Sequence, residues 1–526
     1  MLRFIIIILA LATPLTFAQT LPSVKGYVYQ DLNGDGKRDK NEPGISGVLV
    51  STMDRIGKTD QDGLYNLPLD PDRDMVFVIK PAGYQVPLNA DNLPQFYYIH
   101  QPQGSPQGLK FPGIAPTGKL PASVDFALSP SPDPVNFRLL VSGDPQPRDS
   151  TEVGYYRDAI VTAMMGEQAD AIIALGDIAY DDLSIYPQLN RAIGKLGLPA
   201  YYVYGNHDVN YRAEDNYAAG ETFKSVYGPL YYAAVYGKVH IIPLSSVYYH
   251  GWNKAENKRG AYTGDFTTRQ LNWLRQYLAL VPADHLVVPA MHIPVFSKMI
   301  PGADVTDSSR EALFEVLRGQ NHILGLFGHT HLVEHVAFGE EQGWKGPGEF
   351  WGINPGAGCG SWWSGPKDEN GIPTSYCLDG SPKGFFVVDF NWNRYTARFV
   401  PANLPERNQM RISFPAGVLP ADSLKGRDVL ANIFAAPPDA EVSWRLNDGE
   451  AMAMVRAEIK DPFIVEHLAA YRKDFPTWIE RTADVVHLWR AALPENLPAG
   501  THKITVSVRD RFGNAYQGYQ LFEILP

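Results

Sequence analysis

Five apolar runs in the middle of the chain, each followed closely by side chains that can bind metal, constrain the fold more than any other feature. The runs cover residues 136–141, 169–175, 199–204, 285–291 and 322–327, and each reads as a buried strand. Segments with helical periodicity lie among them, at 155–165, 186–196, 267–280 and 308–317. Buried strands that alternate with helices predict a layered α/β fold, whose functional sites lie at the carboxyl ends of the strands.

The side chains that follow these runs form one candidate metal site. They are Asp144, Gln146, Asp177, Asn206, His207, His292, His329 and His331. Carboxylates, amide oxygens and imidazoles together suit divalent ions such as Mn, Fe or Zn. The set is too large for one ion, and the Asp177 carboxylate can offer one oxygen to each of two metals. Taken alone, residues 205–208 would be an ordinary turn, since Gly, Asn and Asp are common turn residues. The recurrence at five strand ends favours a metal site.

The order of these motifs resembles that of the calcineurin-like metallophosphoesterases, over about residues 136–402. The resemblance implies a four-layer α/β/β/α sandwich with two metal ions, which hydrolyses a phosphate mono- or diester by attack of metal-bound hydroxide. By position, one ion would be held by Asp144, Gln146, Asp177 and His331, and the other by Asp177, Asn206, His292 and His329. His207 would stabilise the phosphoryl oxygens or protonate the leaving group, and Asp208 would orient His207. Gln146 departs from the commonest family pattern, which has His there.

Other histidines and acidic residues near these motifs have no pattern of their own. We interpret His240, His250, His285, His322 and His335 as core or surface histidines. Asp181 and Asp182 follow the Gly176-Asp177 motif closely. They could line the site, but solvated acidic residues are the expectation.

Residues 344–384 form a Gly- and Trp-rich run directly after the last metal motif. Trp362, Trp363 and Tyr376 are candidates for a substrate wall, because their rings could pack on a ring or sugar. The alternative is a glycine-rich loop packed against the C-terminal domain. The only two cysteines, Cys359 and Cys377, lie in this run, and in an oxidising compartment they would form a disulfide. Two unlinked thiols are the alternative.

Residues 19–130 are predicted to form an N-terminal β domain with a calcium-type loop. The loop positions are Asp31, Asn33, Asp35, Lys37, Asp39 and Glu42, with Gly36 at the bend. This spacing is that of a twelve-residue calcium loop, although a solvated acidic turn is the alternative. The strand, the loop and the following Glu-Pro-Gly resemble the calcium-loop type of immunoglobulin-like surface domain. That resemblance implies an immunoglobulin-like fold and a structural Ca²⁺ ion.

The two ends of the chain complete the predicted organisation. Residues 1–18 have one positive charge, an apolar run and small residues at 16 and 18, which indicates a cleaved signal peptide. A transmembrane anchor is the alternative, but Pro14 breaks the run, so we expect no transmembrane segment in the mature chain. The expected location is periplasmic or extracellular. The catalytic domain is assigned to residues 131–402. Residues 403–526 form a C-terminal β domain similar to one that some exported bacterial members of the same family append.

Charge and composition restrict the partners. The chain has 526 residues and a formal net charge of −11, which disfavours bulk nucleic acid as a partner. We expect a small-molecule phosphate ester as substrate: a nucleotide, a sugar phosphate or a phospholipid head group. A surface or periplasmic protein that binds carbohydrate or protein, with a vestigial phosphoesterase centre, is the alternative function.

Overall fold

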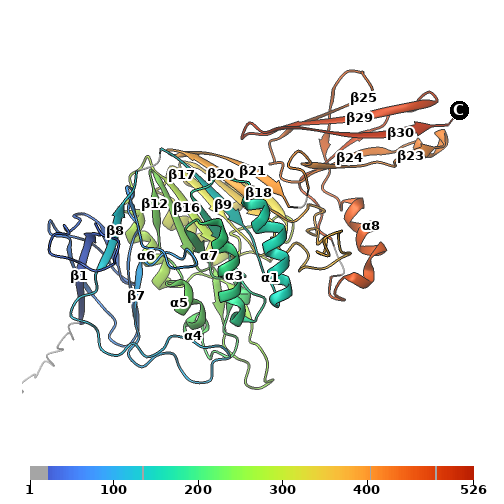
Figure 1. The fold of residues 1–526 in the computed structure, drawn as a ribbon. Coiled ribbons are helices and arrows are strands. Elements are labelled where there is room, and N and C mark those ends of the chain that lie inside the picture. Colours follow the sequence, from blue (N-terminus) through green and yellow to red (C-terminus); the bar gives the residue numbers. More distant parts are fainter. Residues whose placement is uncertain (1–21, 133–134, 403, 480–481, 526) are drawn as a thin grey trace, which may run out of the picture.

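The computed structural model describes residues 22–132, 135–402, 404–479 and 482–525, so the predicted signal peptide lies outside the described residues. Two β-sheets with helices lie at the centre, and β-rich parts lie on either side of them (Figure 1). Within the described residues, no helix has the length and apolar character needed to cross a membrane.

The N-terminal part consists of two four-stranded sheets, with orders β4-β1-β8-β6 and β3-β2-β5-β7. Each predicted strand of this part is present, and β1 pairs antiparallel with β4 and parallel with β8. The strands are β1 Ser23–Gln30, β2 Leu49–Ser51, β3 Ile56–Lys58, β4 Leu64–Pro68, β5 Asp74–Val78, β6 Tyr84–Gln85, β7 Tyr97–His100 and β8 Phe126–Pro130.

The first central sheet has the order β11-β10-β9-β20-β21, in which β9, β10 and β11 are parallel. The second has the order β12-β13-β16-β17-β19-β18, with β13, β16, β17 and β19 parallel. A separate hairpin is formed by β14 and β15. The strands are β9 Asn136–Ser142, β10 Ala171–Ala174, β11 Ala200–Tyr202, β12 Ala234–Tyr236, β13 Val239–Leu244, β14 Val247–Tyr249, β15 Tyr262–Gly264, β16 Leu286–Met291, β17 His322–Leu326, β18 Val333–Phe338, β19 Glu349–Pro355, β20 Gly384–Asn391 and β21 Arg394–Pro401.

Aromatic contacts join these sheets to each other and to their helices, giving the predicted four-layer α/β/β/α sandwich. Phe137 on β9 stacks on Tyr236 on β12, with ring centroids 4.6 Å apart. On the outer face of the first sheet, the Tyr156 hydroxyl of α1 (Ser150–Tyr156) lies 3.0 Å from Ser142 Oγ. On the outer face of the second, the Tyr277 hydroxyl of α6 (Thr268–Leu278) lies 2.7 Å from His240 Nδ1. Buried side chains therefore fill the space between the two stacked sheets and the spaces between each sheet and its helices. The carboxyl ends of the strands are free to carry a site.

The helices of this central part are α1 Ser150–Tyr156, α2 Thr162–Met164, α3 Tyr186–Ile193, α4 Asn216–Ala219, α5 Glu221–Tyr227, α6 Thr268–Leu278 and α7 Asp307–Leu317. The first helix begins five residues before the predicted start at 155, because the Asp149 side chain accepts hydrogen bonds from the Thr151 and Glu152 N–H groups. It continues into α2 through a π-helical turn at 157–161. The apolar periodicity starts later than the cap, which explains the error.

The C-terminal part contains two sheets, β22-β24-β28-β27 and β23-β30-β29-β25-β26. It also contains a helix, α8 Pro462–Ala470, where the sequence predicted only strands. Asp461 caps this helix by accepting from the Phe463 N–H, and Pro462 occupies its first turn. The strands are β22 Met410–Ser413, β23 Gly417–Leu419, β24 Asp428–Ile433, β25 Glu441–Leu446, β26 Met452–Ala453, β27 Val455–Arg456, β28 Leu488–Ala492, β29 Gly500–Arg509 and β30 Ala515–Ile524.

Candidate metal centre

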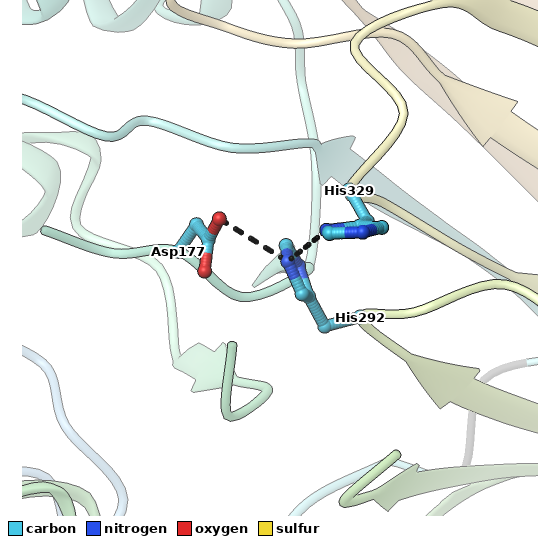
Figure 2. Close-up of side chains that lie close together, drawn as sticks. All are labelled: Asp177, His292 and His329. Atoms are coloured by element: carbon cyan, nitrogen blue, oxygen red, sulfur yellow. Dashed lines mark hydrogen bonds and ion pairs between the residues drawn. The ribbon is translucent and has the colours of Figure 1, made fainter. Parts of the chain in front are cut away.

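The predicted ligands of all five strand ends meet at one place. Asp144 and Gln146 follow β9, Asp177 follows β10, Asn206 follows β11, His292 follows β16, and His329 and His331 follow β17. Ligand atoms of Asp177, His292 and His329 lie within 4.8 Å of one another, and Figure 2 shows the three side chains pointing together. His292 Nε2 lies 3.2 Å from Asp177 Oδ2 and 3.3 Å from His329 Nδ1.

Backbone conformation is unusual at five of these positions. Positive φ angles occur at Asp144 (30°), Gln146 (41°), Asp177 (48°), His329 (72°) and His331 (56°). Non-glycine residues rarely adopt this region, and such residues cluster at functional sites where the surrounding structure holds them. The surrounding structure therefore holds these loops in backbone conformations that are unfavourable for the residues themselves.

Gly205 permits a close approach between the 205–208 turn and the Asp177 loop. A Cβ atom at this position would lie 2.1 Å from the backbone nitrogen of Asp177. Any other residue would push Asn206 and His207 away from the Asp177 loop, so the turn that the sequence predicts is also a packing requirement.

Two imidazoles are fixed so that a lone pair faces the centre. His292 Nδ1 donates to the Leu175 carbonyl at 2.8 Å, and His331 Nδ1 donates to the Gly360 carbonyl at 2.7 Å. Carbonyls only accept, so each Nδ1 carries the proton, and in the neutral ring Nε2 is left as a ligand atom. His292 Nε2 lies 3.0 Å from Asn206 Oδ1, and His331 Nε2 lies 3.5 Å from Asp144 Oδ1. Several electron-pair donors thus face each other across a small space, an arrangement that a divalent cation satisfies.

The electrostatics of the cluster also favour positive charge at this place. Burial alone would lower the pKa of His292, but Asp177 and Asp144 raise it to about 9. Burial would raise the pKa of Asp177, but His292 and His207 hold it well below its usual range. Burial and the charge of His292 lower the pKa of His329 to about 3. Asp177 therefore stays ionised and His329 stays neutral, which are the forms that bind metal, and a bound cation would take the place of the proton that His292 otherwise holds.

Gln146 and Cys359 lie on the side of the first predicted ion. Gln146 Nε2 donates to Asp177 Oδ2 at 3.1 Å, and Cys359 Sγ lies 3.6 Å from Gln146 Oε1. Both cysteines are free and buried, so the predicted disulfide is not formed in the structure. Cys359 Sγ also lies 3.6 Å from His331 Nδ1, so the thiol is in contact with two residues predicted to bind metal.

The predicted role of Asp208 is wrong. Its buried carboxylate accepts hydrogen bonds from the backbone N–H groups of Ile178, Ala179 and Gly205, at 2.9 to 3.2 Å, and from the Tyr186 hydroxyl at 2.9 Å. These bonds tie the Asp177 loop to the 205–208 turn. Burial and the charge of Asp177 raise the pKa of Asp208 to about 7. Asp208 therefore supports the loops and does not orient His207.

Asp181 takes the place predicted for Asp208. Its Oδ1 lies 2.9 Å from His207 Nδ1, and its φ of 63° turns it into the site. The Arg259 guanidinium donates to Asp181 Oδ1 and to the Asn206 carbonyl, so it joins the two loops. Tyr180 stacks on the His207 ring with centroids 4.5 Å apart. The sequence expectation that Asp181 is a solvated residue is corrected. Its only sequence signal was its nearness to Asp177, which it shares with Asp182.

The predicted substrate wall is corrected at two of its three residues. Trp363 is buried and its indole N–H donates to the Pro145 carbonyl at 3.1 Å. Tyr376 packs against Phe463 of α8, with centroids 5.1 Å apart, as expected for a loop packed on the C-terminal part. Trp362 alone lies at the centre: its ring stacks on His331 at 4.2 Å.

The predicted calcium loop is held by its own backbone. Asp31 accepts from the N–H groups of Gly34 and Gly36, and Glu42 accepts from those of Leu32 and Asp39. Among the described residues, Asp177, His292 and His329 are the one group of three or more His, Cys, Asp or Glu ligand atoms this close together. Calcium binding therefore stays a prediction.

Comparison with known families matches the three parts of the chain in order. Family models match residues 32–114 (N terminal of calcineurin-like phosphoesterase), 137–333 (calcineurin-like phosphoesterase) and 353–516 (C terminal of calcineurin-like phosphoesterase). The chain belongs to the calcineurin-like phosphoesterases. These are metal-dependent hydrolases of phosphoric esters, which agrees with the ligand set described above.

Individual relatives match shorter stretches of this calcineurin-like chain. A cAMP/cGMP dual specificity phosphodiesterase of Mycobacterium tuberculosis is 28% identical over 178 residues, which are 33% of this chain and 52% of that protein. Serine-aspartate repeat-containing protein F of Staphylococcus epidermidis is 40% identical over 78 residues, 13% of this chain and 5% of that protein. The chain thus spans about half of the first relative and a small part of the second.

Two solved structures are similar at low identity. A dimetal phosphatase from Danio rerio has 16% identity and a TM-score of 0.36, covering 51% of this chain and 98% of its own. Purple acid phosphatase PPD1 from yellow lupin (Lupinus luteus) seeds has 11% identity and a TM-score of 0.37, covering 68% and 67%.

Proposed function

We propose that this chain is exported and hydrolyses a phosphate mono- or diester with two divalent transition metal ions, Mn, Fe or Zn. The observation that carries the proposal is the meeting of seven predicted ligands in which the His292 and His331 lone pairs face carboxylate and amide oxygens. The hydrogen bonds of His292 and His331 to carbonyls fix the tautomer that binds metal through Nε2, a feature that a vestigial centre does not require. Export rests on the signal-like residues 1–18.

The residues divide into metal-holding and proton-handling groups. Asp177 lies between the two predicted ligand sets and would bridge them, with His292, His329 and Asn206 on one side and Asp144, Gln146 and His331 on the other. Bound metal ions would polarise the phosphoryl oxygens and acidify a coordinated water. His207, only partly buried and held by Asp181, would place its Nε2 toward the ester and donate a proton to the leaving oxygen.

Within phosphate esters, we propose a small organic substrate: a nucleotide, a sugar phosphate or a phospholipid head group. The relative from M. tuberculosis is a cAMP/cGMP phosphodiesterase, so cyclic nucleotides belong among the first substrates to test. The net charge of −11 argues against long nucleic acid.

Metal content and turnover test this function together. We expect about two transition metal ions per chain and hydrolysis of at least one of bis(p-nitrophenyl) phosphate, p-nitrophenyl phosphate, cyclic nucleotides or phospholipids. Asp177→Asn keeps the size of the side chain and tolerates positive φ, but should lose metal and more than about 100-fold of activity. Asp182→Asn, beside the site, is the matched control. Metal-loaded wild type that hydrolyses none of these esters would favour the binding-protein alternative.

A further inference from the structure

Two tryptophans meet at right angles beside the metal centre, and one of them comes from the C-terminal part of the chain. Trp362 stacks on the His331 ring at 4.2 Å, with an interplanar angle of 26°. Trp478 meets Trp362 edge to face, at 4.5 Å and 76°. The side chain of Trp478 is 52% exposed, and Trp362 is half-buried. The corner between these rings therefore has a solvent-accessible ring on each side and lies one ring away from a predicted metal ligand.

The segment that carries Trp478 is firmly anchored. Arg472 donates to the carbonyls of Pro476 at 3.1 Å and Thr477 at 2.9 Å. Phe475 and Ile479, on either side of Trp478, are buried in the cluster that α8 forms with the 360–378 loop. The exposure of Trp478 thus does not follow from a loose chain, because its neighbours in sequence are packed.

A closely packed glycine docks this segment on the loop that contains Trp362. The Gly365 N–H donates to the Asp474 carbonyl at 2.9 Å. Gly365 has φ 98°, and a Cβ there would lie 3.1 Å from the Phe475 ring. The corner is consequently built by two chain segments that fix each other.

Trp362 also connects to the other side of the metal centre. Arg148 donates to the Trp362 carbonyl at 2.5 Å, and its guanidinium lies 5.7 Å from the Tyr180 ring centroid. Tyr180 stacks in turn on His207. A continuous series of contacts therefore links His207 to Trp478 along one border of the site. It passes through Tyr180, Arg148 and Trp362.

We propose that Trp362 and Trp478 form a subsite for a planar aromatic group of the phosphate ester substrate. The inference rests on the proposed phosphoesterase function and names the substrate class more closely. Perpendicular indoles offer a flat group one face to stack on and one edge to meet, the two preferred geometries of aromatic pairs. An acyl chain would need a continuous apolar groove, whereas Arg472, Lys473 and Thr477 are exposed beside Trp478.

Inhibition by small phosphonates tests the subsite without depending on the true substrate. Phenylphosphonate and methylphosphonate carry the same metal-binding group and differ in the ring. In Trp478→Ala, the inhibition constant of phenylphosphonate should rise about 3- to 10-fold and that of methylphosphonate should stay unchanged. Trp478→Phe should recover most of the loss. Trp392→Ala is the matched control, because Trp392 is 45% exposed in the turn between β20 and β21.

Several results would overturn the inference. An equal rise for both phosphonates would show that Trp478 supports the metal centre and binds no ring. A rise for butylphosphonate as large as that for phenylphosphonate would show a general apolar surface. An unchanged constant for phenylphosphonate would refute the subsite while leaving the proposed function intact. If neither phosphonate inhibits a wild type that hydrolyses phosphate esters, the subsite is refuted and the proposed function stands. If the wild type hydrolyses no phosphate ester, the proposed function fails, and the inference fails with it.

Discussion

Replacing Asp181 by Asn should reduce turnover, because Asp181 and not Asp208 holds His207, the proposed proton donor. The Asp181 Oδ1 atom lies 2.9 Å from His207 Nδ1 and also accepts from Arg259. Asn keeps an acceptor oxygen but removes the charge. A hydrogen bond to a charged group contributes about 1.5–3 kcal/mol and a neutral one about 0.5–1.5 kcal/mol, so about 1–2 kcal/mol of positioning is lost. This corresponds to about a 5- to 30-fold fall in kcat/KM.

Leaving-group dependence separates this role from general damage. With metal-saturated enzyme, the loss in Asp181→Asn should be larger for diphenyl phosphate than for bis(p-nitrophenyl) phosphate, because the poorer leaving group needs the proton more. Asp182→Asn is the control, since the Asp182 carboxylate accepts from Ser184 at 2.6 Å and at 3.1 Å.

Asp208→Asn should behave differently. Its amide would face the N–H groups that the carboxylate now accepts and leave about one of them unpaired, which costs about 1–3 kcal/mol of stability. The thermal midpoint should fall, with no change in leaving-group dependence. If Asp181→Asn kept full activity while Asp208→Asn acquired the leaving-group dependence, the assignment of the two carboxylates would be refuted.

Two further predictions concern stability. Burial and the neighbouring His285 lower the pKa of His240 to about 3. Below pH 6.5 this histidine therefore binds a proton in the unfolded chain but not in the folded chain, and the free energy of unfolding falls as the pH falls toward 3. Between pH 7 and pH 5 this loss of stability amounts to about 2 kcal/mol. Over the same pH change, the urea midpoint of His240→Gln should drop less than that of the wild type, and an equal drop would contradict the reasoning. If the 31–42 loop binds calcium with a dissociation constant of about 0.1 mM, 1 mM calcium should stabilise the N-terminal part by about 1.4 kcal/mol. Calorimetry should show this in the wild type and in Asp62→Asn, but not in Asp35→Asn; a gain retained in Asp35→Asn would leave only a solvated turn.

The succession of strands and helices along the chain, and the strand ends at which the predicted metal ligands lie, could be predicted from sequence because both follow from the pattern of apolar runs. An apolar run that ends in Asp177 or His292 brings that residue to the carboxyl edge of a parallel sheet, whatever the loop does next. The partner of His207 could not be predicted in this way. Asp208 and Asp181 are both near the motif, and only the folded backbone shows that N–H groups bind the Asp208 carboxylate while Asp181 reaches the ring.

Contacts between distant segments were also beyond the sequence. Trp363 and Trp362 are neighbours with the same side chain, yet one is buried against Pro145 and the other stacks on His331. Both residues have positive φ angles, 53° at Trp362 and 51° at Trp363, and neither angle can be read from residue type. Helix α8 was missed although Asp461-Pro462 is a recognisable helix start, because the strands around it dominated the interpretation.

The left-handed backbone at the predicted metal ligands limits how this site could change in the course of evolution or in the laboratory. Asp, Asn and His tolerate positive φ better than other non-glycine residues, and they are also the side chains that bind metal. A residue that replaces Asp144 or His329 must therefore both bind metal and tolerate a positive φ angle. Very few residue types meet both requirements. Gln146 satisfies them least well. We expect variants with altered metal preference to appear first at that position.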